Sequence, residues 1–124
     1  MTPKPTESEL EILSIIWQKG KVTVREVHEK LAEIKDTGYT TTLKTMQIMH
    51  TKGLLHRDEK NRTHVYFAAI GEKVTQKNLV ENFVATAFGG SAKNLVMQAL
   101  GQGNTSKEEL DEIRAFLDQI ENEK

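Results

Sequence analysis

The chain contains three capping boxes, and this pattern limits most narrowly what it can fold into. Thr6, Thr23 and Ser106 are each followed three residues later by a glutamate and then by apolar residues at helical spacing. In a capping box the hydroxyl and the glutamate satisfy backbone N–H groups that the start of a helix leaves unpaired. The pattern predicts helices that begin at these three points, and Gly20 predicts where the first one ends.

The first 70 residues are expected to fold into three short helices followed by a β-hairpin. The helices are predicted from Thr6 to Gly20, from Thr23 to the segment 36–38, and from about Tyr39 to Lys52. On the second helix, Val27, Leu31 and Ile34 recur on one side, which predicts that this side is buried. β-branched and aromatic residues predict strands at about 54–58 and 63–69, joined by a polar turn.

The remaining residues are expected to form a helical region with a different role. Helices are predicted over about 72–88, over 91–100 and from Ser106 onward. On the last helix, apolar residues recur at spacings of 3, 4 and 3, a stripe typical of packing between helices. Because this acidic helix has no obvious apolar surface in its own chain, the stripe favours an obligate homodimer. Packing back onto the helix over 72–88 is the alternative.

The predicted fold class is therefore mainly α with a small β-hairpin. A winged helix-turn-helix domain is expected over residues 1–70, followed by a helical dimerisation region over residues 71–124. The residues expected to mediate dimerisation are Phe83, Leu95, Val96, Leu110, Ile113, Leu117 and Ile120. A winged helix can also serve protein contact alone, so the topology by itself does not establish DNA binding.

Positive charge is concentrated in one stretch of the chain. The formal net charge is −1, but residues 38–70 hold 5 Lys and Arg against 2 Asp and Glu. Residues 71–124 hold 6 against 9. A basic stretch of this kind is expected either at an anionic partner or on an ordinary solvated surface, and charge alone does not separate the two.

The third predicted helix is the main candidate for a binding element. Thr42, Met46 and Met49 cluster on one side of its helical wheel, which predicts that this side faces the core. Threonine is a poor helix former, so its repeated use here favours close contact with a polar, anionic partner. The alternative is an exposed threonine-rich helix with no partner. The residues expected to contact DNA are Thr40, Thr41, Lys44, Gln47, Ile48 and Thr51 on the helix, and Arg57, Lys60 and Arg62 on the hairpin.

Three segments of the chain carry a family resemblance. They read ELEILSIIWQKGKVTVREVHEKL, then YTTTLKTMQIMHTKGLLHRDEKNRTHVYF, then FGGSAKNLVMQAL with TSKEELDEIRAFL after it. Together they resemble the penicillinase-repressor type of bacterial transcriptional regulator (BlaI/MecI/CopY). The most specific pieces are Trp-x-x-Gly after the first helix, Thr40-Thr41, Lys52-Gly53 and Tyr66. The resemblance implies a homodimer that represses genes from palindromic operators in double-stranded DNA.

The departures from the family pattern limit what the resemblance implies. The family usually has aliphatic residues where Thr42 and Thr45 stand, and arginine where Ile48 stands, so its operator sequence does not carry over. Antibiotic-resistance members are inactivated by cleavage of an Asn-Phe bond, and the matching position here reads Gln98-Ala99. This predicts that the cleavage route is absent, and it leaves a sensor protease partner unassigned.

Other function classes have weaker support in the sequence. No Gly-x-Ser-x-Gly, His-Glu-x-x-His or glycine-rich phosphate loop is present, so neither an enzyme nor a cofactor is expected. There are no cysteines, and no metal site is expected, because the histidines match no common ligand spacing. These are His28, His50, His56 and His64. A histidine-based metal sensor is the second reading, and a winged helix for protein interaction is the third. No signal peptide or membrane span is recognisable, so a cytoplasmic location is expected.

Overall fold

The computed structural model describes residues 4–124 and divides the chain into two compact units. The first runs up to Lys77 and the second is Asn78–Lys124. The boundary falls inside helix α4 (Glu72–Thr86), so each unit is described by itself. No helix among residues 4–124 combines the length and the apolar character needed to cross a membrane.

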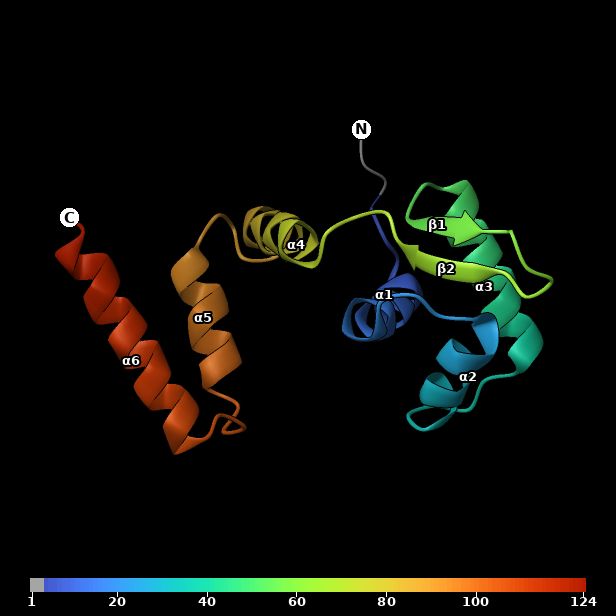
Figure 1. The fold of residues 1–124 in the computed structure, drawn as a ribbon. Coiled ribbons are helices and arrows are strands. Elements are labelled where there is room, and N and C mark those ends of the chain that lie inside the picture. Colours follow the sequence, from blue (N-terminus) through green and yellow to red (C-terminus); the bar gives the residue numbers. More distant parts are fainter. Residues whose placement is uncertain (1–3) are drawn as a thin grey trace. The chain divides into compact units, whose positions relative to one another are not determined.

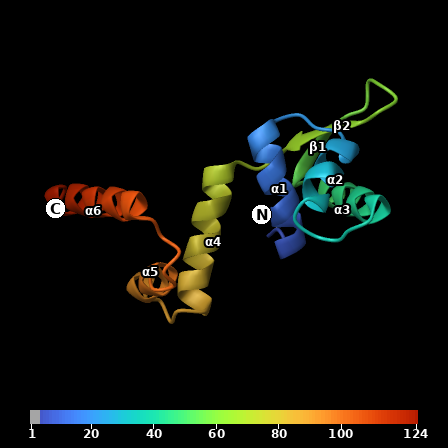
Figure 2. The same ribbon diagram turned by 90° about the horizontal axis from the view of Figure 1, so that it is seen from below.

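The first unit is a winged helix-turn-helix. Its elements follow in the order α1 (Glu7–Lys19), α2 (Val24–Ala32), α3 (Tyr39–Thr51), β1 (Leu55–Asp58) and β2 (Val65–Ala68) (Figure 1). The two strands pair antiparallel, with Arg57 opposite Tyr66. The loop between them projects beyond the three helices (Figure 2). This arrangement confirms the predicted fold class, mainly α with a small β-hairpin.

The helix starts confirm the capping pattern, with one difference. Thr6 and Thr23 each accept a hydrogen bond from the backbone N–H three residues later, and each donates its own N–H to the glutamate there. Ser106 also caps its helix, accepting from the Glu109 N–H at 3.1 Å. The Glu109 carboxylate, however, accepts from the Ser106 hydroxyl at 3.2 Å. At this third site the glutamate binds the capping side chain instead of the capping backbone.

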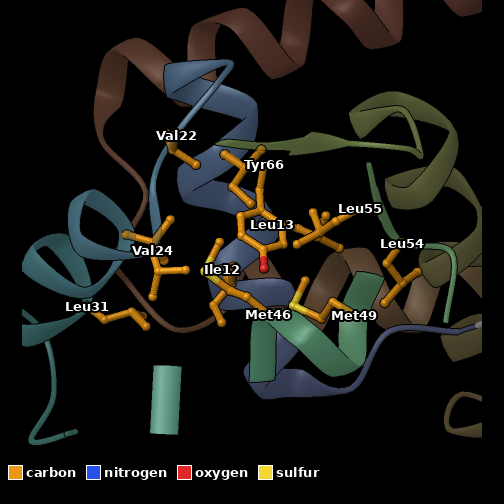
Figure 3. Close-up of a cluster of buried hydrophobic side chains, with 12 residues drawn as sticks. Ile12, Leu13, Val22, Val24, Leu31, Met46, Met49, Leu54, Leu55 and Tyr66 are labelled. Carbon is orange, nitrogen blue, oxygen red and sulfur yellow. The ribbon is translucent and has the colours of Figure 1, made fainter. Parts of the chain in front are cut away.

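The core of the first unit joins all three helices to the hairpin (Figure 3). Leu13 of α1, Val27 of α2 and Met46 of α3 are each fully buried, and Tyr66 of β2 packs among them. Burying an apolar side chain of this size contributes about 1.5–3 kcal/mol. The prediction that Thr42, Met46 and Met49 face the core is confirmed.

The prediction for Ile34 is wrong. This residue is 66% exposed, although Val27 and Leu31 of the same predicted face are buried. Helix α2 ends at Ala32, and the Ile34 N–H bonds back to the Leu31 carbonyl in a turn. The helix that would have placed Ile34 on the same face as Leu31 therefore ends two residues before it.

Long-range hydrogen bonds fix the hairpin and the segment after it. Val22, in the link between α1 and α2, donates to the Tyr66 carbonyl at 2.9 Å and accepts from the Tyr66 N–H at 2.7 Å. The Trp17 indole N–H donates to the Ile70 carbonyl at 3.0 Å. The hairpin is thereby held at its second strand and just beyond it.

The second unit contains the rest of α4, α5 (Ala92–Leu100) and α6 (Lys107–Asn122). Within residues 78–124, no side chain of α5 or α6 is buried. Of the predicted dimerisation residues, three are exposed: Phe83 at 54%, Val96 at 46% and Leu117 at 52%. The other four are half-buried, namely Leu95, Leu110, Ile113 and Ile120. Their role in dimerisation stays a prediction.

An ion pair between a buried carboxylate and a half-buried lysine joins the start of α1 to the end of α3. The Lys52 ammonium lies 2.7 Å from Oε1 of Glu9, whose side chain is 5% exposed. The same carboxylate oxygen accepts the Thr6 backbone N–H at 2.8 Å. Burial raises the pKa of Glu9, but the hydrogen bonds from Lys52 and Thr6, with the Lys52 charge, outweigh it and leave the pKa below its ordinary value.

We expect Lys52→Met to lower the free energy of unfolding of the first unit by about 2 kcal/mol, because it leaves a buried carboxylate without its cation. Urea unfolding followed by the fluorescence of Trp17, the single tryptophan, measures this. The matched control is Lys35→Met, which removes the more exposed Lys35–Glu11 pair at 2.9 Å. An exposed pair contributes about 0–1 kcal/mol, so the control should change little.

Acid should remove the difference between wild type and Lys52→Met. A lowered pKa means that Glu9 stabilises the fold while it is ionised and that this contribution is lost as pH falls through the lowered value. Equal losses for Lys52→Met and Lys35→Met at neutral pH would contradict the role given to the Lys52–Glu9 pair.

Candidate nucleic-acid interface

The outer side of α3 carries a shallow depression lined by predicted site residues. Lys44, Gln47, Ile48 and Thr51 line it together with Lys52, in a volume of about 350 Å³. Steps of four and three residues place these side chains on one helix face, opposite the buried methionines. Ile48 is 45% exposed there, an apolar group among ammonium, amide and hydroxyl groups. Thr40 is also exposed, one turn before Lys44.

Thr41 lies three residues before Lys44, at the margin of this face. It lines a small crevice of about 60 Å³ on another flank of α3, together with Thr42 and Thr45. The other walls of that crevice come from α1, from the end of α2 and from the segment after it. Thr41 is exposed, and it lines this crevice instead of the depression that Lys44 and Gln47 line.

Several threonine hydroxyls on α3 bind their own helix. Thr51 donates to the Gln47 carbonyl at 3.1 Å, and Thr45 donates to the Thr41 carbonyl at 2.9 Å. Such bonds occupy the hydroxyl hydrogen and leave the oxygen lone pairs for a partner. On the outer face, Thr51 is therefore set up to accept hydrogen bonds, while Lys44 and Gln47 supply donors.

Thr42 is buried, and its hydroxyl has hydrogen-bond partners. His28 Nδ1 lies 3.2 Å from the Thr42 oxygen, which also lies 3.4 Å from the Gly38 carbonyl. A buried hydroxyl is tolerated when it has hydrogen-bond partners. This contact links α2 to α3.

A larger hollow lies between α2, α3 and the hairpin. Its volume is about 530 Å³, and its polar lining includes Arg25, Gln47, Arg62 and His64. Gln47 of the helix and Arg62 of the hairpin thus meet at one concave surface, as the sequence predicts for residues of one binding site. Guanidinium groups suit phosphate oxygens, and the amide suits base edges.

Arg57 and Lys60 lie elsewhere on the hairpin. They line a separate hollow of about 510 Å³ with Lys21, Glu59 and Phe67. Arg57 lies 2.9 Å from Glu59 and is 21% exposed. A hydrogen bond with Tyr66 and the charge of Glu59 raise the pKa of Arg57 above its ordinary value. Arg57 therefore braces the hairpin, with part of its charge balanced within the chain.

Arg25 and Tyr39 also line the larger hollow, although neither is among the residues that the sequence predicts to contact DNA. Arg25 lies outside the basic stretch 38–70, so counting charge along the chain gave no signal for it. Its place in the first turn of α2 was visible, but its proximity to α3 depends on how the two helices pack.

The four histidines have different surroundings. His28 contacts Tyr39 and His50 contacts Tyr66, while His56 lies against Phe67. His64 lies 3.9 Å from Glu59. Among residues 4–124, no group of three or more His, Cys, Asp or Glu side chains is arranged to hold a metal ion.

Known proteins are similar to this chain over almost its whole length. A sequence model of the penicillinase repressor family matches residues 5–119. The methicillin resistance regulatory protein MecI of Staphylococcus aureus (strain N315) is 23% identical over 112 residues, covering 90% of this chain and 91% of that protein. The penicillinase repressor of Bacillus licheniformis is 26% identical over 123 residues, covering 98% and 95%. The transcriptional regulator BlaI of Mycobacterium tuberculosis is 25% identical over 111 residues, covering 89% and 80%.

Proposed function

This chain belongs to the penicillinase repressor family, and on that basis we propose that it is a transcriptional repressor that binds a palindromic operator in double-stranded DNA as a homodimer. The observation that carries the proposal is the outer face of α3, where hydrogen-bonding groups are gathered beside a projecting hairpin. A helix fits the major groove, which presents a different pattern of donors and acceptors for each base pair.

In this proposal the side chains of α3 contact DNA bases, and the hairpin contacts the phosphate backbone of the DNA. Lys44 and Gln47 present donors to base edges, and the exposed Ile48 contacts a thymine methyl group. Because an isoleucine cannot hydrogen-bond guanine, we expect A·T at the facing position. Arg62 binds phosphate oxygens from the hairpin, a contact that positions the protein without reading sequence.

The exposed apolar side chains of the second unit support dimerisation. Helices α5 and α6 bury no side chain within the described chain, although α6 carries Leu110, Ile113, Leu117 and Ile120 at regular spacing. Apolar surface of this kind is stabilised by removal from water. A second copy offers the same stripe, and a two-fold dimer matches a two-fold operator.

The helix and the hairpin should respond differently to mutation. Arg62→Ala should weaken binding to random and selected duplexes alike and flatten the dependence of log affinity on log salt by about one unit for each lost contact. Lys44→Ala or Gln47→Ala should cost about 1–3 kcal/mol on the selected sequence and little on random DNA. Ile48→Arg should move the preferred base towards guanine. The measurement is selection from a random duplex pool, followed by titration at several salt concentrations.

Two outcomes would count against this proposal. A wild-type protein whose binding does not change with salt would contradict contact with phosphates, since each neutralised phosphate contributes about −0.9 to the slope. If Arg62→Ala changed the selected sequence while Lys44→Ala and Gln47→Ala lowered all affinities alike, the roles of helix and hairpin would be reversed.

Leu117→Asp should shift the protein from dimer to monomer and weaken binding to the selected duplex, with the first unit still folded. Truncating a buried leucine typically costs about 2–5 kcal/mol, and a carboxylate in the same interface adds a desolvation cost. Sedimentation at micromolar concentration gives the oligomeric state, and Trp17 fluorescence reports the fold. Gln119→Asp, an exposed position on the same helix, is the control and should remain dimeric. A Leu117→Asp variant that stays dimeric would show that the stripe packs elsewhere.

The Gln98-Ala99 bond should resist the proteases that cut family members at Asn-Phe. Both residues lie in α5 and are exposed, so the difference in sequence, rather than burial, is the reason for this expectation. Incubation with a sensor protease, beside a family member that carries the Asn-Phe bond, tests it by mass spectrometry. Cleavage between Gln98 and Ala99 would refute the prediction.

A further inference from the structure

Arg25 makes a cation–π contact with an aromatic ring at the edge of the larger hollow. Its guanidinium carbon lies 5.6 Å from the centroid of the Tyr39 ring. An exposed arginine usually samples many rotamers, and attraction to a ring face favours some of them before any partner binds. Tyr39 itself is 41% exposed, so its ring lies at the surface rather than in the core.

The ring that holds Arg25 is itself held in place. The His28 ring meets Tyr39 edge-on, with centroids 5.7 Å apart and planes at 82°. His28 Nδ1 lies 3.2 Å from the buried Thr42 hydroxyl. Tyr39 is the first residue of α3, so this series of contacts joins Arg25 of α2 to the start of the helix proposed to read DNA.

The charged residues that line the larger hollow are both basic. Arg25 lines it from α2, Arg62 lines it from the hairpin, and none of its described lining residues is acidic. The hollow on the other side of the hairpin differs, because Asp58 and Glu59 are part of its lining. The larger hollow therefore favours an anionic occupant, whereas the other is partly neutralised.

We propose that this hollow seats one strand of the DNA phosphate backbone, with Arg25 and Arg62 as phosphate contacts and Tyr39 as the residue that positions Arg25. This rests on the proposed function. With α3 in the major groove and the hairpin beside it, the DNA strand that borders the groove passes between α3 and the hairpin, along the hollow that they form with the start of α2. Arginine matches two phosphate oxygens through paired N–H groups, and a guanidinium already held over a ring offers this geometry at lower entropic cost.

The test uses the full chain and a random-sequence duplex, because phosphate contacts do not depend on sequence. Arg25→Ala should weaken binding and reduce the salt slope by about one unit for each subunit bound. Lys30→Ala is the matched control: it removes an exposed cation from the other end of α2, where Lys30 lies 3.6 Å from Glu33. Its affinity and slope should match those of the wild type. Arg25→Lys keeps the charge and should keep the slope, with weaker binding than wild type.

Tyr39→Leu separates positioning from general stability. It should lower affinity, and the double variant Arg25→Ala/Tyr39→Leu should bind no more weakly than Arg25→Ala alone, because Tyr39 acts through Arg25. Thermal unfolding of each variant shows that the fold is retained. An unchanged salt slope in Arg25→Ala, or additive losses in the double variant, would overturn this inference while leaving the proposed function intact. Absence of salt-dependent duplex binding by the wild type would overturn both.

Discussion

Two backbone hydrogen bonds between Val22 and Tyr66 hold the β-hairpin against the helices, and the candidate binding surface depends on them. The Tyr66 ring fills the core between Leu13 and Leu55, while its backbone pairs with the link between α1 and α2 (Figure 3). Because backbone groups are rigidly spaced, this pairing sets where the hairpin lies relative to α3. This position of the hairpin is what lets Arg62 line the same hollow as Gln47 of α3.

The polar contacts around α3 divide into those that hold the helix and those that remain for a partner. Glu9 and Lys52 fix its C-terminal end, and His28 with Thr42 fixes its start. Lys44 and Gln47 lie on the opposite face, in a shallow depression. A reading helix needs this division, since groups that meet base edges discriminate only when their backbone does not move to accommodate a wrong base.

Within residues 78–124, the second unit lacks the buried core that the first unit has around α3. Its helices have well-formed caps, such as Ser91 and Ser106, but α5 and α6 bury no side chain in the described chain. Local hydrogen bonds thus specify where the helices begin, while apolar residues such as Phe116, at 60% exposed, remain in contact with water. Such helices need another surface to cover their apolar residues, and in the proposed homodimer the second copy provides it.

The sequence by itself determined the features that depend on neighbours three or four residues apart. The starts of α1 and α2, the buried side of Met46 and Met49, and the two strands could all be predicted, because caps, helical spacing and strand-forming runs are local. Ile34 was mispredicted because a turn ended the helix before it. The tertiary structure alone decided that Thr41 lines a crevice closed by α1 and the end of α2, and that Arg25 of α2 shares a hollow with Arg62 of the hairpin. These placements follow from the angles at which helices and hairpin pack, which no local pattern encodes.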